Sequence, residues 1–319
     1  MKNFKPLAIL GASVAFASFG FASATTAQTA GNSFTIAETG QSFSTLQAAV
    51  DAVGNRTATI SIAPGTYRQC AVQKAGVITY TAQEFGTAIF SGTACEGKAS
   101  LVLRGQGAEV RGLTFTGISV PDGNGAGIRL EKNNLNIAFT RFLSSQQGIL
   151  TANDAQGRIF ITRSTFSRLG TCENSAGCAH SIYVGKYGAL TVTQSRFERG
   201  TGGHYVKSRA PNNVIENNSF DDAQGTSTNY MIDLPNGSLG TIANNMFVQG
   251  RDKENYSALI ALGAKGTQNP SDGLVVRNNE ARFVPGLSRK TAFLADWSNS
   301  RVVMEGNRLA AGIEQLDVR

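Results

Sequence analysis

The residues best suited to chemistry lie between positions 180 and 237, in three strand-like segments that read HSIYVGKYG, GHYVKSRAP and NYMIDLPNG. Aligning Ile182, Val206 and Ile232 places the polar residues of these segments in two columns. The columns are Tyr183, Lys207 and Asp233, and His180, His204 and Tyr230. Cationic, acidic, imidazole and phenol groups on neighbouring strands can bind an anionic substrate and transfer protons.

The direction of each side chain decides whether it can meet a substrate. Lys207 follows the apolar Val206, so we expect Lys207 to point outward, and Arg209, two residues on, should share its face. The same alternation predicts that Tyr205 points outward. The two histidines have inward parity, although as the first residues of their strands they could instead sit at the corner and face a groove.

A cationic pair flanked by tyrosines and a carboxylate suits β-elimination from a uronate polymer. A cation neutralises the sugar carboxylate while a base removes the neighbouring proton. The candidate catalytic residues are Lys207, Arg209, His204, His180, Tyr183 and Asp233, and the candidate substrate-binding residues are Tyr205, Tyr230, Asn236 and Arg251. The structural alternatives are a surface ion pair between Lys207 and Asp233, worth about 0–1 kcal/mol, and a polar corner stack of the histidines.

These segments belong to an internal repeat. An aliphatic residue, two variable positions, a Ser, Thr or Asn, another variable position and a Phe recur along the chain. The copies close on Phe115, Phe142, Phe166, Phe197, Phe220 and Phe247. Two degenerate copies follow and close on Ala281 and Leu309. The fourth position is Leu113 in the first copy and is polar in the others, where it is Thr140, Ser164, Ser195, Asn218, Asn245, Asn279 and Asn307. We expect these polar side chains to bond from rung to rung at a turn, with the phenylalanines stacked inside.

Short strands, an Asn-rich corner and a Phe row predict an all-β fold, a right-handed parallel β-helix of roughly eight to ten coils. In this pattern the chain resembles the pectate-lyase-like superfamily. Residues 43–67 resemble the opening of such proteins, with a short capping helix from about Ser44 to Val53 and a strand that ends in Gly65-Thr66-Tyr67. The resemblance implies one β-helix domain over residues 28–319, on a fold that carries many activities.

A closer resemblance concerns VKSRAPNNVIENNSF, which is similar to a segment of alginate and chondroitin B-type polysaccharide lyases. It implies that Lys207 is the base. The segment MIDLPNG lacks the arginine that those enzymes carry on the next strand, and Arg209 is our candidate to replace it. A polysaccharide lyase is therefore the leading prediction. A glycoside hydrolase, an epimerase and a non-catalytic binding or surface protein stay open alternatives, although Asp221 and Asp222 look like turn residues.

The N-terminus predicts export. Lys2 and Lys5 precede an apolar run and then small residues, which is the pattern of a signal peptide over residues 1–27, cleaved near 24 or 27. The apolar run is too short to span a membrane. Removing the two lysines lowers the formal net charge from +7 to +5. We expect a secreted or periplasmic monomer whose partner is an acidic polysaccharide rather than nucleic acid.

The four cysteines are an even number, which suits an oxidising compartment. The candidate disulfide residues are Cys70, Cys95, Cys172 and Cys178, with Cys70 and Cys95 about one repeat apart and Cys172 and Cys178 at the ends of a short loop. No cofactor is predicted. A metal site is undetermined, and calcium stays an open alternative, because the sequence has no clear acidic cluster to ligate it.

Overall fold

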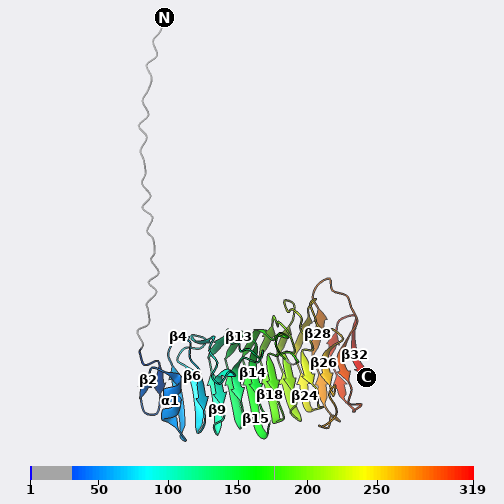
Figure 1. Cartoon of the computed structure of the whole chain (residues 1–319). Helices are drawn as coiled ribbons and strands as arrows, with labels where there is room; N and C mark the ends of the chain where they lie inside the picture. Colours follow the sequence, from blue (N-terminus) through cyan, green and yellow to red (C-terminus); the bar gives the residue numbers. More distant parts are fainter. Residues whose placement is uncertain (2–30, 176) are drawn as a thin grey trace. The chain divides into compact units, whose positions relative to one another are not determined.

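The computed structural model describes Met1 and residues 31–175 and 177–319. The expected signal peptide, apart from Met1, lies outside the described residues. Asn32–Arg319 forms one compact unit, a stack of coils in which each coil contributes one short strand to each of three sheets (Figure 1). We name the twelve-stranded sheet A and the ten-stranded sheets B and C. None of the helices in the described part of the chain has the length and apolar character needed to cross a membrane.

The chain visits sheets A, B and C in turn, and every pairing within them is parallel except those of the first two strands. Sheet A contains β2 (Ser42–Phe43), β1 (Phe34–Ile36), β3 (Thr57–Ile62), β6 (Val77–Ala82), β9 (Gly107–Arg111), β12 (Asn134–Ala138), β15 (Asp154–Thr162), β18 (Tyr187–Thr193), β21 (Asn212–Glu216), β24 (Leu239–Ala243), β27 (Val275–Arg277) and β30 (Val303–Glu305). Sheet B contains β4 (Gly65–Tyr67), β7 (Ala88–Ser91), β10 (Thr114–Thr116), β13 (Arg141–Ser145), β16 (Thr165–Leu169), β19 (Arg196–Glu198), β22 (Ser219–Asp221), β25 (Met246–Gln249), β28 (Glu280–Phe283) and β31 (Arg308–Leu309).

Sheet C, which holds the chemically interesting residues, also runs the length of the stack. Its strands are β5 (Ala71–Gln73), β8 (Ala99–Leu103), β11 (Ala126–Leu130), β14 (Gln147–Thr151), β17 (Ile182–Val184), β20 (Val206–Ser208), β23 (Ile232–Leu234), β26 (Ala258–Leu262), β29 (Thr291–Asp296) and β32 (Ile313–Val318). Ten rungs in sheets B and C confirm the predicted parallel solenoid and its number of coils.

The one α-helix among the described residues, α1 (Leu46–Val53), lies at the N-terminal end of the coils, as predicted. The hydroxyl of Thr45 caps it by accepting a hydrogen bond from the Ala48 backbone N–H at 3.2 Å. Its apolar side chains, among them Leu46 and Val50, are buried against the first coils. The helix therefore covers apolar surface that the first coil would otherwise expose to water.

Stacked phenylalanines fill the interior beside sheet B. Ring centroids of neighbouring rungs are 4.8 Å apart from Phe166 to Phe197 and from Phe197 to Phe220, with nearly parallel planes. All of these rings are buried. The predicted Phe row is confirmed, and its spacing follows from the distance between hydrogen-bonded strands, about 4.8 Å.

The polar ladder lies at the corner between sheets A and B. Asn245 Oδ1 accepts a hydrogen bond from the Asn218 backbone N–H at 2.9 Å, and Asn245 Nδ2 donates to the Ile215 carbonyl at 2.8 Å. Asn279 repeats the first contact one rung later, accepting from the Asn245 N–H at 3.0 Å. These side chains bond to buried backbone groups at the turn and at the end of β21, which confirms the predicted ladder.

Replacing one member of the ladder should destabilise the whole stack. We expect Asn245→Ala to lower the free energy of unfolding by roughly 2 kcal/mol or more, because the Ile215 carbonyl and the Asn218 N–H lose their buried partner. Chemical denaturation measures the change. Asn136→Ala, at an exposed position of β12, is the matched control and should change stability by less than about 0.5 kcal/mol. Equal effects of the two substitutions would contradict the role assigned to the ladder.

Candidate functional site

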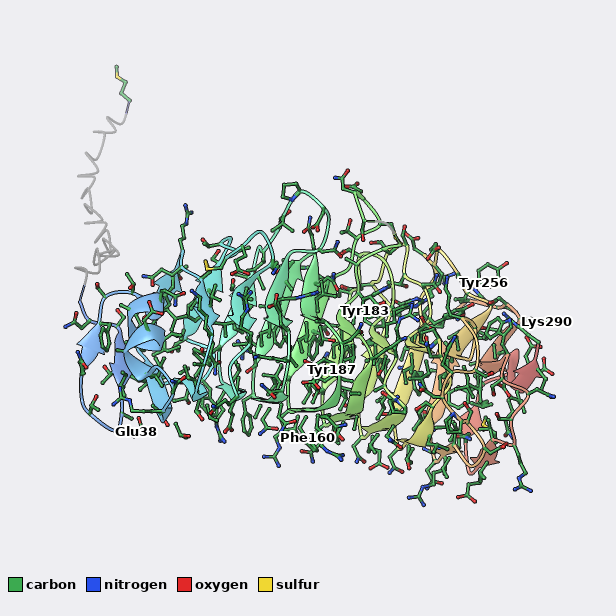
Figure 2. All side chains as sticks on the ribbon, turned by 60° about the horizontal axis from the view of Figure 1, so that its bottom comes forward. Glu38, Phe160, Tyr183, Tyr187, Tyr256 and Lys290 are labelled. Atoms are coloured by element: carbon green, nitrogen blue, oxygen red, sulfur yellow. A yellow bond between two sulfur atoms is a disulfide. The ribbon has the colours of Figure 1, made fainter. Side chains whose placement is uncertain are left out.

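The column of Tyr183, Lys207 and Asp233 exists as predicted. Strands β17, β20 and β23 pair in parallel with Tyr183 opposite Lys207 and Lys207 opposite Asp233. Ile182 and Val206, one position earlier on their strands, are buried in the interior. The column therefore lies on the outer face of sheet C, on a different side of the solenoid from the exposed Phe160 of sheet A (Figure 2).

The corner before sheet C breaks the simple alternation of side chains. Tyr205 and Val206 are consecutive, yet both belong to the buried core. Tyr205 precedes the first residue of β20, so the pleat of the strand does not yet set its direction. The backbone reaches this corner through Gly203, whose φ is +60° and where a Cβ would lie 2.1 Å from the Ala179 carbonyl oxygen.

One predicted orientation is wrong for this reason, and the orientation of the histidines, which the sequence left open, is decided. Tyr205, expected on the outer face as a substrate-binding residue, is only 2% exposed, and its hydroxyl donates to Asp222 Oδ1 at 2.7 Å. The predicted outward direction of Tyr205 is therefore wrong. The histidines, which have inward parity by strict alternation, contact the outward column instead: His204 Nε2 lies 3.3 Å from Asp233 Oδ2, and the ring of His180 meets Tyr183 edge-on at 5.5 Å.

Asp233 is the centre of the outer cluster. Its Oδ2 accepts a hydrogen bond from Lys207 Nζ at 2.5 Å and lies next to His204 Nε2. The Lys207 and Asp233 side chains are only 11% and 5% exposed. This pair is therefore much more shielded from solvent than the surface ion pair of our structural alternative, and removing one partner would leave a poorly solvated charge.

The ring column continues on both sides of His204. His204 stacks on His180 at 4.8 Å and on Tyr230 at 5.5 Å, as the alignment of the three segments predicts. The Tyr230 hydroxyl accepts a hydrogen bond from Asn255 Nδ2 at 2.9 Å. Tyr230 thus supports the histidine stack from the next rung.

Arg209 joins the cluster from the end of β20. Its Nε donates to the Tyr183 hydroxyl at 3.0 Å, and its Nη1 donates to Asn236 Oδ1. The guanidinium and the Lys207 ammonium each lie 5.9 Å from the centre of the Tyr183 ring. The structure therefore brings together Arg209, Asn236 and Tyr183 beside Lys207, as the sequence analysis expected.

Burial keeps both histidines neutral. Burial, and then the neighbouring His204 and Lys207, lower the pKa of His180 well below its ordinary value. Burial, and then the Lys207 charge, lower the pKa of His204 in the same direction. His180 Nδ1 accepts from the His204 backbone N–H at 3.0 Å, so the proton of neutral His180 is on Nε2.

A disulfide closes the loop that leads into this cluster. Cys172 and Cys178 are bonded with their Cα atoms 4.0 Å apart, and Ala179 N donates to the Thr171 carbonyl at 2.6 Å. The second disulfide joins Cys70 and Cys95. Both candidate pairings are confirmed, and the first of them fixes the chain just before His180.

Arg251 is engaged elsewhere. Its guanidinium donates to the Pro285 carbonyl at 2.7 Å, and its own carbonyl accepts from Arg289. None of these contacts joins Arg251 to the cluster around Asp233. The structure thus gives no support to the prediction that Arg251 binds substrate together with Lys207.

Sequence analysis missed two groups of charges. Asp222, interpreted as a turn residue, is fully buried and pairs with Lys253 at 2.9 Å, with Tyr205 and Thr228 completing the network. No sequence signal links Asp222 to Lys253, because they come from different coils. The second is the single residue Arg129, which shares the outward column of Tyr183 and Lys207. Extending the strand alignment back to the segment GIRLE would have found it.

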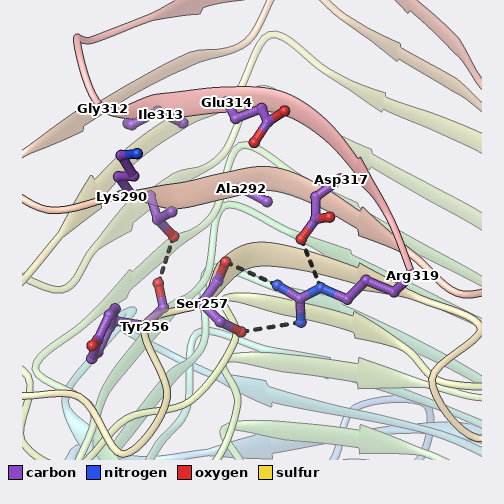
Figure 3. Close-up of a pocket in the computed structure, with 10 residues that line it drawn as sticks. Tyr256, Ser257, Lys290, Ala292, Gly312, Ile313, Glu314, Asp317 and Arg319 are labelled. Carbon is purple, nitrogen blue, oxygen red and sulfur yellow. Dashed lines mark hydrogen bonds and ion pairs between the residues drawn. The ribbon is translucent and has the colours of Figure 1, made fainter.

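A separate hollow of about 530 Å³ lies among the last coils (Figure 3). Arg319 crosses it, donating to Asp317 at 2.7 Å and to the Ser257 hydroxyl at 3.3 Å, and Tyr256 and Lys290 stand at its side. The charges of Arg319 and Asp317 neutralise each other there. Lys290 and Glu314, of opposite charge, line it as well, so the hollow offers a ligand no net charge.

Three parallel sheets, a stacked aromatic interior and an asparagine ladder define a parallel β-helix protein. The model of the family described as right handed beta helix region matches residues 99–309, and the chain belongs to this family. Among solved structures the chain is similar to ORF18 of Geobacillus virus E2, with 13% identity and a TM-score of 0.50 over 86% of this chain. It spans 58% of that protein, and the likeness concerns the fold alone. No curated protein matches the sequence.

The two histidines should make stability depend on pH. Their folded pKa values lie below the unfolded value of about 6.5, so the unfolded state binds more protons as the pH falls through that value. We expect each to lower the free energy of unfolding by on the order of 1 kcal/mol between pH 7.5 and about 5.5. Denaturant titrations at both pH values measure the loss.

A double variant isolates this contribution. His180→Asn keeps an acceptor near the position of Nδ1, and His204→Gln keeps a donor near Asp233, while neither new side chain titrates. Between about pH 5.5 and 7.5, the free energy of unfolding of this variant should change much less with pH than that of the wild type. If the free energy of unfolding of the variant changes with pH as much as that of the wild type, other groups cause the pH dependence.

Proposed function

We propose that this protein is an exported polysaccharide lyase that cleaves a uronate-containing polymer on the outer face of sheet C. The observation that supports the proposal most is that Lys207 and His204 share the carboxylate of Asp233 on an outward face, beside Arg209. In β-elimination the bond from hydrogen to the carbon beside the carboxylate breaks, a double bond forms, and the glycosidic oxygen leaves and takes up a proton. Such a reaction needs a cation, a proton acceptor and a proton donor.

The cluster contains a residue for each role. Arg209, oriented by Tyr183 and Asn236, is the cation for the sugar carboxylate. Neutral His204 is the acceptor through Nδ1, the buried ring nitrogen that has no hydrogen-bond partner among the described residues, because its Nε2 faces Asp233. The Lys207 ammonium, which already donates to Asp233, is the donor for the leaving oxygen. This assignment differs from the base role that the resemblance implied for Lys207, because an ammonium bonded to a carboxylate has no free lone pair.

Export is part of the proposal. The Cys70–Cys95 and Cys172–Cys178 disulfides favour an oxidising compartment. A hydrolase has less support, because Asp233 is the one carboxylate among the clustered residues and Asp222 is buried beside Lys253. Hydrolysis on this fold would need a second carboxylate flanking the same bond.

A non-catalytic binder of acidic polysaccharide is the second candidate. One observation favours it: the Lys207–Asp233–His204 network is nearly buried and internally paired, so it can serve to hold three coils together. A binder would retain an anionic glycan on this face and leave its length unchanged.

Incubation with alginate, pectate, glucuronan and bacterial exopolysaccharides tests the proposal. The ultraviolet absorbance of an unsaturated uronate should rise with at least one polymer. Lys207→Met should reduce turnover by roughly 10²–10⁴-fold, because the proton donor is lost. Lys74→Met, at an exposed position after β5, is the matched control and should keep full activity.

Two results would count against the lyase. Binding of a polymer without any loss of chain length, measured by size-exclusion chromatography, would favour the binder. Full activity of Lys207→Met, with unfolding as cooperative as in the wild type, would exclude the role given to Lys207.

A further inference from the structure

A cleft of about 510 Å³ adjoins the cluster on its N-terminal side. Arg129, Lys186 and Arg209 line it together with Tyr183 and Leu150. Tyr183 and Arg209 also belong to the cluster around Asp233, so the cleft and the cluster are continuous. The polar groups of the cleft are therefore placed to meet the same ligand.

The three cations of the cleft are not neutralised by neighbouring acids. No carboxylate of the described residues lies within 4.0 Å of their side-chain nitrogens. Glu131, whose charge acts on Arg129 from farther away, is bonded to Lys98 and Arg104 instead. The cleft is thus a local excess of positive charge, unlike the paired network at Asp233.

Arg129 also has an unused donor. Its Nε is buried and has no hydrogen-bond partner among the described residues. Burial lowers the pKa of Arg129, which means that its surroundings do not fully compensate the charge. A buried donor without a partner is uncommon, and an anion in the cleft that Arg129 lines would compensate its charge.

The strand register fixes where this charge stands. Arg129 pairs with Leu150, and Leu150 pairs with Tyr183, which is opposite Lys207. Three rungs therefore separate Arg129 from Lys207, or about 14 Å at roughly 4.8 Å per rung. Half-buried Leu150 lies between Arg129 and Tyr183 as an apolar floor on which a sugar ring can rest.

We propose that this cleft is an anion subsite, in which Arg129, with Lys186, binds a carboxylate or sulfate ester of an acidic polysaccharide, while Arg209 stands at the boundary with the cluster at Asp233. The substrate class rests on the proposed function. Arg129 holds the anion by paired N–H donors, and the exposed Lys186 adds charge at the rim. A polymer lying across the rungs places one sugar on Leu150 and another beside Lys207, so the subsite fixes its position along the solenoid.

Calorimetric titration of the full chain at low salt tests the subsite. The probes are an oligogalacturonate, which carries carboxylates, a dextran sulfate oligosaccharide, which carries sulfate esters, and neutral dextran. We expect one of the anionic probes to bind, dextran to fail, and Arg129→Gln to weaken binding by about tenfold or more. Arg158→Gln removes an exposed arginine from sheet A and should leave binding unchanged. Which of the two anionic probes binds shows whether the subsite accepts a carboxylate or a sulfate ester.

The outcomes separate the subsite from the proposed reaction. Binding that depends on Arg129 supports the subsite even if no polymer yields an unsaturated product, in which case only the lyase fails. Failure of both anionic probes to bind, or equal binding by Arg129→Gln and the wild type, overturns the subsite whether or not Lys207-dependent cleavage is found. Thermal unfolding of Arg129→Gln with unchanged cooperativity verifies that the variant is folded.

Discussion

Parallel pairing between successive coils is the constraint on which the other features of this protein depend. Because each strand has a partner one rung away, side chains at equivalent positions repeat at nearly the spacing of the strands, and the Phe166, Phe197 and Phe220 rings stack at 4.8 Å. The same register that packs these rings inside also aligns Tyr183 with Lys207 outside. The candidate site is therefore positioned by the packing of the interior, and a slip of one residue in any coil would disperse it.

The corner before sheet C determines which aromatic and imidazole groups reach the surface. Two consecutive residues, Tyr205 and Val206, point inward there, and this shifts His204 to the outer side, where it contacts Asp233. Tyr205 binds Asp222 inside, and Asp222 pairs with Lys253. One local departure from alternation thus produces two polar networks, an internal one that ties coils together and an external one that can meet a ligand.

Charge is distributed unevenly over the outer face of sheet C. Around Asp233 the charges are paired and shielded, which favours precise positions over attraction of a ligand. Around Arg129 they are unpaired and line an open cleft. An anionic polymer would be attracted by the second region and oriented towards the first. In the function we propose, the anion subsite at Arg129 and the cluster at Asp233 lie on different rungs and have Tyr183 and Arg209 in common.

The sequence by itself determined the parallel β-helix, the Phe row, the Asn ladder and the column of Tyr183, Lys207 and Asp233, and it offered the two cysteine pairs as candidates that the structure confirms. The fold, the Phe row, the ladder and the column follow from a repeat, because residues at equivalent positions of a stacked coil must be neighbours. Only the tertiary structure decided that Tyr205 is buried, that His204 faces Asp233 and that Asp222 pairs with Lys253. Those contacts depend on the backbone path at the corners, where neither strand alternation nor the repeat fixes the direction of a side chain.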